Sequence, residues 1–356
     1  MAACVLVLSA SALAFIAPPP GVVELYYSTS VYPVIQSLLT AGSNQVGFAL
    51  CDLILLAALG FLIVLAFLYS RRLSRAGRGN RIRVLAGLVV RLVVVSSAAY
   101  LGFVFLWGLN YSRRPLSAKL DFDRGRVDSN AVRALKRLSI DRLNEEYEGA
   151  RTVDWPAEAD WRVHLGDSFR DVVRELGSNA TFRPGVPKRS FLTSYLGASG
   201  VTGFLNPFCG EVILDPGLLE FERPFTLAHE WAHLAGYADE SEASFVGFLA
   251  CIRSGSSAVR YSGWLSIYQQ TPRLEPLDHD SAREQPQLRR EVLADLQAAR
   301  ELAERRRNHL ISRVQATVYD QFLKANRVSA GLASYGLLVE LVAGTRFEDG
   351  WTPVRR

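Results

Sequence analysis

Uncharged apolar runs dominate the first third of this 356-residue chain and are separated by polar stretches. The runs cover residues 2–17, 53–69 and 92–109. Because an α-helix rises about 1.5 Å per residue, runs of this length cross or nearly cross a hydrocarbon core about 30 Å thick. The pattern therefore predicts three transmembrane helices in a membrane anchor that covers residues 1–111.

The first run also has the length of a secretory signal peptide, which would be cleaved from the mature chain. A signal peptide normally begins with a basic region, and no Lys or Arg precedes residues 2–17. We therefore favour an uncleaved anchor.

Positive charge between the second and third runs sets the expected orientation. Six arginines, from Arg71 to Arg83, lie there with no acidic residue among them, whereas residues 18–45 carry only Glu24 as a charged residue. Basic loops stay in the cytoplasm, so we expect a multi-pass protein of the cell membrane with residues 112–356 on the exterior face. These residues hold equal numbers of basic and acidic side chains, so the net charge of +5 belongs to the anchor. A nucleic-acid partner is not expected, because it would require a basic face on the folded domain.

Residues 112–356 are long enough for one folded domain, and their pattern is mainly helical. Amphipathic periodicity predicts helices at residues 132–149 and 157–176. Within residues 190–215, the segments SFLTSYL, VTGFL and EVIL are rich in β-forming residues and are broken by glycines, which predicts a hairpin or small sheet. The charged residues 288–322 predict one long solvated helix or two. The expected fold is an anchor joined to a mainly helical α+β domain.

The sequence HEWAH places His229 and His233 one helical turn apart, and Pro224 favours a helix start just before them. Two imidazoles on one helix face can bind Zn²⁺, and Glu230 then lies beside the open position of the ion as a general base. Uncharged flanking residues suit a buried metal site. The alternative is an ordinary helix with two hydrogen-bonded histidines and an exposed glutamate.

A zinc ion bound by two histidines needs a third protein ligand, and Asp239, Glu240 and Glu242 follow Gly236. Gly236 can end the first helix, and a second helix is expected over residues 240–252. Glu240 shares a face of that helix with small side chains, which allow two helices to approach closely. Glu242 lies on a bulky apolar stripe. We favour Glu240 as the third ligand, with Glu242 second or as a carboxylate that orients a histidine, and Asp239 as a further alternative.

The run HEWAHLAGYADESEAS resembles the gluzincin zinc metallopeptidases, in which the HExxH helix is followed by a helix opening with Glu-x-x-Ala-small or Glu-x-Glu-Ala-Asp. The resemblance implies a zincin-like fold, with His229, His233 and Glu240 as zinc ligands and Glu230 as the general base. The sequence departs from the pattern at Ser244, where many relatives have an aspartate that supports a histidine.

Two further likenesses involve the same motif. The spacing from Gly236 to Asp239 is similar to that of the metzincins, with aspartate in place of the usual histidine. With its apolar segments and its C-terminal run YDQFLKANRVSAGLASYG, the whole chain also resembles a bacterial family of uncharacterised membrane-anchored proteins that carry the motif. That likeness implies a fold and no known substrate.

A zinc peptidase also needs a hydrogen-bond donor for the oxyanion of the tetrahedral intermediate. The candidate donors are Tyr261, His279, Arg327 and Tyr335. In peptidases of this type an edge strand pairs with the substrate backbone, and residues 200–204 are the candidate for that strand.

The cysteines add one expectation. Cys209 and Cys251 both fall in the exterior part, where a disulfide between them could form, although free buried thiols are the more common state. A cysteine-zinc site is not expected, because the chain has no CxxC spacing.

The leading hypothesis is a membrane-anchored zinc metallopeptidase that hydrolyses peptide bonds with a zinc-bound water activated by Glu230. Its expected cofactor is Zn²⁺, and its expected partners are the lipid bilayer and a peptide or protein substrate. The competing hypothesis is a non-catalytic, zinc-stabilised binding or scaffolding protein, in which Asp239 or Glu242 closes the site as a fourth ligand. Cleavage within the bilayer is not expected, because the motif lies far along the chain from the last apolar run and its helix is too short to span.

Overall fold

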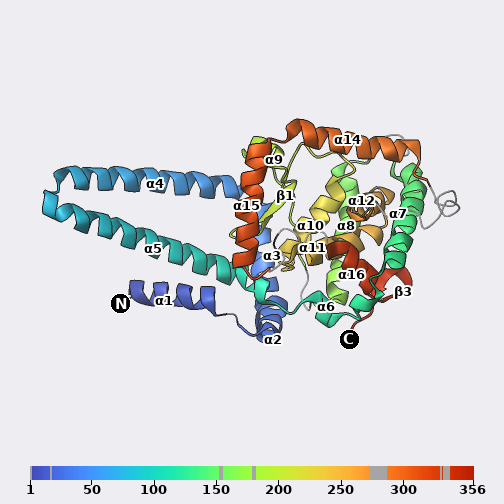
Figure 1. Cartoon of the computed structure of the whole chain (residues 1–356), viewed down its shortest axis with the longest axis horizontal. Coiled ribbons are helices and arrows are strands. Elements are labelled where there is room, and N and C mark those ends of the chain that lie inside the picture. The colour runs from blue at the N-terminus through green and yellow to red at the C-terminus, as the bar shows by residue number, and fades with distance from the viewer. Residues whose placement is uncertain are drawn as a thin grey trace.

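The computed structural model describes residues 2–16, 18–151, 155–178, 182–272, 287–328, 331 and 337–356. These residues form a mostly helical protein with two small two-stranded sheets. Two long helices project from a rounded helical body (Figure 1). The expected combination of apolar helices, a mainly helical body and a small sheet is confirmed.

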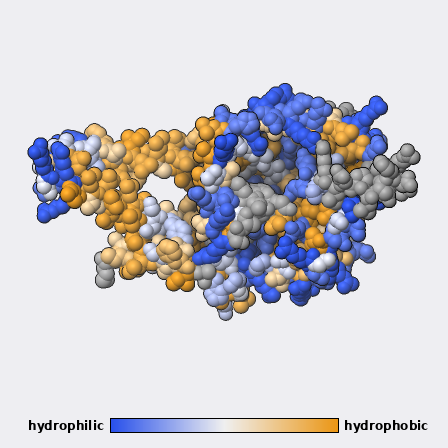
Figure 2. Space-filling model, in the orientation of Figure 1, coloured by the Kyte–Doolittle hydropathy of each residue, from blue (hydrophilic) through white to orange (hydrophobic). Residues whose placement is uncertain are grey.

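The long helices α4 (Leu50–Arg75) and α5 (Arg81–Leu106) contain the second and third apolar runs, and η2 (Arg78–Asn80) joins them. Both helices are long and apolar enough to cross a membrane, and almost none of their apolar surface is buried inside the protein. Apolar side chains cover both helices, and hydrophilic residues gather at their joined ends (Figure 2). Helix α5 ends three residues before the expected position 109, because Trp107 leaves the helical conformation and η3 (Gly108–Ser112) follows.

The first apolar run forms a shorter helix, α1 (Ala2–Phe15). A second helical stretch follows, made of α2 (Pro20–Val22), the π-helix η1 (Val23–Val31) and α3 (Tyr32–Asn44). The two parts meet at a bend of 109°. The described residues therefore contain two helices that fit a membrane, or three if this bent pair counts as one span.

Helix α3 packs against the body, although the sequence grouped it with the anchor. Tyr32, Gln36 and Thr40 follow one another at intervals of one helical turn and form a polar stripe. Each side chain donates a hydrogen bond to a backbone carbonyl of the body, at 2.7 Å to Leu234, 2.8 Å to Arg183 and 2.8 Å to Gly210 respectively. Residues 20–44 thus support the body from the side on which α4 begins and α5 ends.

Five helices contribute most of the main core: α7 (Ser129–Ala150), α8 (Glu158–Glu175), α10 (Arg223–Leu234), α11 (Glu240–Ile252) and α12 (Ser257–Gln270). Every residue of α11 is buried, so this helix forms the centre of the core. The helices predicted at residues 132–149 and 157–176 are confirmed as α7 and α8.

The predicted hairpin is confirmed as the antiparallel pair β1 (Gly203–Asn206) and β2 (Glu211–Leu214), with Gly203 opposite Leu214. The strand prediction for SFLTSYL is wrong, because residues in this segment form helix α9 (Thr193–Ser199). Helical spacing turns Leu192 and Leu196 towards one apolar cluster around Ile213, and this packing outweighs the β-propensity of the segment.

The charged segment after residue 287 forms two helices, α14 (Arg290–Arg306) and α15 (His309–Ala325). Asn308 separates them, because its side chain accepts hydrogen bonds from the amides of Leu310 and Ile311 and thereby starts α15. The remaining elements are short: α6 (Leu116–Lys119), η4 (Arg124–Arg126), α16 (Leu338–Gly344), β3 (Phe347–Glu348), η6 (Asp349–Trp351) and β4 (Thr352–Pro353).

The Cys209–Cys251 disulfide is not formed, and both cysteines are free. Cys251 is fully buried in α11, where its Cβ faces Gly263 of α12. Cys209 lies in the turn of the hairpin and is partly exposed. The two thiols therefore belong to different layers of the protein.

Candidate metal centre

Helices α10 and α11 carry the motif, and the turn between them sets their relative position. Pro224 occupies the first turn of α10, where its missing N–H costs no hydrogen bond. Gly236 follows α10 with a φ of +86°, a conformation that favours glycine. Asp239 then caps α11 and accepts hydrogen bonds from the amides of Ser241 and Glu242. The chain reverses so tightly that the first residue of α11, Glu240, faces α10.

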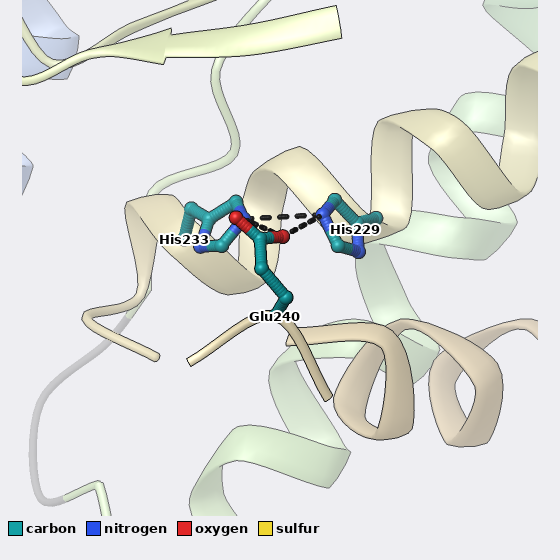
Figure 3. A group of neighbouring side chains, drawn as sticks. All are labelled: His229, His233 and Glu240. Carbon is teal, nitrogen blue, oxygen red and sulfur yellow. Dashed lines mark hydrogen bonds and ion pairs between the residues drawn. The ribbon is translucent and has the colours of Figure 1, made fainter. Parts of the chain in front are cut away.

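His229, His233 and Glu240 converge on one point (Figure 3). The Nε2 atoms of the histidines are 3.1 Å apart, and each is 3.1 Å from Oε2 of Glu240. Among the residues that the structure describes, this group has three ligand-type side chains whose donor atoms meet closely enough to hold a metal ion. The sequence prediction that these three side chains lie together is thus matched by the geometry.

The spacing of the three donor atoms fits a small tetrahedral ion. With bonds of about 2.0–2.1 Å, two ligand atoms on a tetrahedral zinc ion are roughly 3.3 Å apart. The observed separations of 3.1 Å differ from this value by a few tenths of an ångström. Two imidazole nitrogens and one carboxylate oxygen are also donor types that zinc accepts.

Hydrogen bonds to the far side of each imidazole orient the rings. His233 donates from Nδ1 to the carbonyl of Tyr237 at 2.8 Å, which leaves its Nε2 directed at Glu240. Nδ1 of His229 pairs with the hydroxyl of Ser244 at 3.1 Å. Ser244, where the gluzincin pattern has an aspartate, therefore still contacts the histidine. Such contacts fix the ring that a metal ion would bind.

The charges of the group reinforce one another. Burial alone would lower the pKa of His233, but the adjacent Glu240 carboxylate outweighs this effect and raises the pKa to about 9. Burial would likewise raise the pKa of Glu240, yet the two imidazoles hold it well below its usual range. Glu240 is therefore ionised and attracts positive charge to this point.

The two alternative third ligands are engaged elsewhere. Asp239 serves as the cap of α11. Glu242 points to the other side of α11, where its Oε1 accepts a hydrogen bond of 2.6 Å from the amide of Leu116. The structure brings neither carboxylate into the group of His229, His233 and Glu240.

Glu230 lies beside the group and is 4% exposed. Its Oε2 has no hydrogen-bond partner among the described residues, and burial raises the pKa of its carboxyl group. The side chain lies beneath β1, because a Cβ added to Gly203 would come within 3.0 Å of it. Glu230 is thus buried, and no hydrogen bond from a described residue occupies its Oε2 atom.

A cavity of about 780 Å³ opens over these residues. His229, Glu230 and His233 form its floor, and β1, α9, α15 and the end of α5 contribute its walls. In the described part of the chain, β1 pairs with β2 on one side only. Gly203, Phe204 and Leu205 of this strand line the cavity. That a substrate backbone pairs there stays a prediction.

Tyr319 of α15 was not anticipated from the sequence. Its hydroxyl donates a hydrogen bond to Oε1 of Glu240, and its ring lines the cavity. The signal lay in the spacing of Ser312, Gln315 and Tyr319, which places polar groups on one face of α15. The many charged residues of the segment suggested a solvated helix, so this polar face was not recognised from the sequence.

Two of the four predicted oxyanion donors, Tyr261 and Arg327, do not line the cavity. Tyr261 lies in the core, where its hydroxyl donates to Asp295 at 2.7 Å. Arg327 donates to the Ser112 hydroxyl and to the backbone carbonyl of Leu13. Tyr261 belongs to an apolar stripe at helical spacing, and such a stripe normally faces the core. The other two candidates, His279 and Tyr335, lie outside the described residues.

The end of α5 forms part of the site. Phe103 and Trp107 line the cavity, and the indole N–H of Trp107 donates to the backbone carbonyl of His233 at 2.8 Å. We expected the motif to be remote from the last apolar run because of its distance along the chain. That reasoning was wrong, because the fold brings the two segments into contact.

Fold and site together define a class of protein: a mainly helical chain with two or three helices that fit a membrane, and a buried His-His-Glu group beside an unpaired glutamate. Residues 27–343 match the family described as "Protein of unknown function (DUF3810)", and the chain belongs to that family. The match agrees with the expected likeness to an uncharacterised family, and it includes α4, α5 and the site. No curated protein and no solved structure matches the chain.

A matched pair of variants tests the choice of the third ligand. Glu240→Gln should lower the affinity of the purified chain for zinc about 100-fold or more, because it removes the charged donor. Glu242→Gln keeps an oxygen acceptor for Leu116 and should change the affinity by less than about threefold. Competition with a chelator measures both. The reverse ranking would contradict the ligand assignment.

The closeness of α10 and α11 gives a second prediction. A Cβ at Gly247 would lie 3.0 Å from the amide nitrogen of His229 and 3.2 Å from the carbonyl carbon of Ala228. Gly247→Val should force the helices apart, destabilise the chain by about 1–3 kcal/mol and weaken zinc binding about tenfold or more. Gly42→Val in α3 is the control, because a Cβ there meets no atom within 4 Å. Unchanged zinc affinity in Gly247→Val would show that the close approach is not required.

Proposed function

We propose that this chain is a membrane-anchored, zinc-dependent metallopeptidase of the gluzincin kind. The observation that carries the proposal is the convergence of His229, His233 and Glu240 beside a buried, unpaired Glu230 carboxylate, at the floor of a cavity. The order of these residues on two consecutive helices supports the same assignment. Zinc held there would supply Lewis acidity, which lowers the pKa of a water molecule towards 7 and polarises a carbonyl group.

Glu230 is the proposed general base. Its carboxylate lies next to the two histidines without a competing hydrogen-bond donor among the described residues, so it can accept a proton from water. Burial raises its pKa, which makes it a stronger base and lets it hold the proton until the leaving amine accepts it. A carboxylate in a purely structural site would not need to remain unpaired.

The surrounding elements supply positioning. The open edge of β1 presents backbone groups beside Glu230 and can pair with an extended peptide, which sets the direction of the substrate across the site. Tyr319 brings a phenolic O–H to the same cavity. We assign to this O–H the role of turning from Glu240 to the substrate carbonyl oxygen and donating a hydrogen bond to it as negative charge develops there.

The expected orientation of the chain completes the proposal. The joined ends of α4 and α5 carry arginines and no acidic residue, and they lie far from the site (Figures 1 and 2). Basic connections remain in the cytoplasm. The cavity would therefore face the exterior of the cell membrane.

The competing idea of a zinc-stabilised protein without catalysis requires a closed site. Structural zinc sites usually have four protein ligands. In the described residues, three ligand-type side chains meet, and both Asp239 and Glu242 are used in other hydrogen bonds. The geometry therefore favours an open position and a reactive site.

The general base is tested by Glu230→Gln in the full-length chain. The variant should bind zinc as wild type does and cleave a peptide library at least about 100-fold more slowly, because the amide cannot accept a proton. Mass spectrometry of the library measures cleavage, and chelator competition measures zinc. Equal cleavage by the two proteins would refute the role of Glu230, and absence of cleavage by zinc-loaded wild type would leave the binding hypothesis.

Tyr319→Phe tests the proposed donor to the oxyanion. Loss of one such donor should reduce kcat about 10²-fold or more with little change in KM, because the bond forms only in the transition state. Tyr195→Phe is the control, since its hydroxyl also lines the cavity wall but donates to Gln315. A rise in KM with unchanged kcat would assign Tyr319 to substrate binding instead.

A further inference from the structure

Helix α15 presents an apolar stripe to the outside of the protein. Leu310, Val314 and Val318 recur at intervals of four residues and are 70%, 55% and 59% exposed. The opposite face carries Ser312, Gln315 and Tyr319, which line the cavity. A helix on the surface of a globular domain normally turns its apolar stripe inward and its polar face to water. This reversal indicates an apolar environment outside α15.

The position of α15 identifies that environment. The N-terminal end of α15 is bound to α9, because the backbone N–H of Asn308 donates a hydrogen bond to the carbonyl of Ala198 at 2.9 Å. The segment just before α9 is tied in turn to α4, because Asp52 accepts hydrogen bonds from the Ser190 hydroxyl and the Phe191 amide. At the other end of α15, the ring of Phe322 lies 6.2 Å from that of Phe103 in α5.

Helix α15 therefore crosses the body-side ends of both long helices, and it lies across their direction in Figure 1. If α4 and α5 cross a bilayer, a helix in this position lies along its surface. An amphipathic helix with its apolar face towards the lipid is the usual form of such an interfacial element.

Exposed aromatic residues continue the same surface. Phe191, at the start of the α9 segment, is 57% exposed, and Phe208 in the hairpin turn is 38% exposed. Phe208 lies beside α5, because a Cβ added to Gly102 would be 3.9 Å from its ring. It is thus level with the last turns of that helix. Phenylalanine is among the side chains that interfacial elements bury at the boundary between headgroups and lipid tails.

We propose that the outer face of α15, together with Phe191 and Phe208, rests in the lipid surface, and that the site acts on polypeptides tethered to the same bilayer. The second part rests on the proposed peptidase function. The cavity lies directly behind α15, and its wall includes Phe103 and Trp107 at the end of α5. A chain that emerges from the bilayer beside α5 reaches this cavity at a high effective concentration, whereas a soluble chain does not have this advantage.

The lipid contact is tested without any enzyme assay. The full-length chain carries the photoreactive residue p-benzoylphenylalanine in place of Val314, Val318 or Leu293, and it is reconstituted in vesicles that contain biotinylated phosphatidylethanolamine. Leu293 is the matched control, an exposed apolar residue of α14. Lipid should be crosslinked at 314 and 318 at least about tenfold more than at 293. Equal crosslinking at all three positions would overturn the proposal.

The substrate class is tested on the same vesicles with one peptide library in two forms, with and without an N-terminal palmitoyl chain. Wild type should cleave the tethered form about tenfold or more faster than the free form. The double variant Val314→Glu/Val318→Glu should lose most of this preference while its cleavage of the free form stays within about twofold, and Leu293→Glu should behave as wild type. Zinc binding checks that each variant is folded.

The outcomes separate the two proposals. Tethered and free peptides cleaved at equal rates by wild type would overturn the substrate class and leave the peptidase function standing. Lipid crosslinks at 314 and 318 without cleavage of either form would refute the peptidase function, and with it the substrate class, while supporting the membrane contact of α15.

Discussion

The close approach of α10 and α11 is the constraint on which the site depends. The absence of a side chain at Gly247 lets α11 lie against the backbone of His229, and the left-handed turn at Gly236 makes the reversal short enough. Under these two conditions the carboxylate of Glu240 lies between two imidazoles that are one turn apart on the neighbouring helix. A bulkier contact would separate the donors and leave a buried carboxylate without positive partners, which is costly in a protein interior.

The C-terminal end of α10 links this constraint to the segments that flank the long apolar helices. The last carbonyls of a helix have no partner within it and need other donors. Here the indole of Trp107 donates to the carbonyl of His233, the hydroxyl of Tyr32 to that of Leu234, and the guanidinium of Arg113 to that of Gly236. All three donors come from segments that flank the apolar helices. The site is therefore held between the core and the helices that fit a membrane.

The sequence predicted those features that depend on local pattern. The apolar runs followed from contiguous uncharged residues, and the hairpin strands from β-forming segments broken by glycines. The placement of Glu240, and not Glu242, beside the histidines followed from which residues share a helix face. The features that it did not predict depend on contacts between distant segments. Leu192 and Leu196 pack against Ile213, so a β-rich segment became α9. The contact of Tyr319 with Glu240 and that of Trp107 with α10 arise only when α15 and α5 meet the motif in space, which neither periodicity nor composition encodes.

The zinc K-edge X-ray absorption spectrum of the purified full-length chain tests the central claim most directly. The account predicts about one zinc ion per chain, with two imidazole nitrogens and carboxylate or water oxygens at about 2.0–2.2 Å and no sulfur ligand. Binding of much less than one zinc ion per chain would contradict the proposed metal site. A bound zinc ion with fewer than two imidazole ligands would contradict it as well.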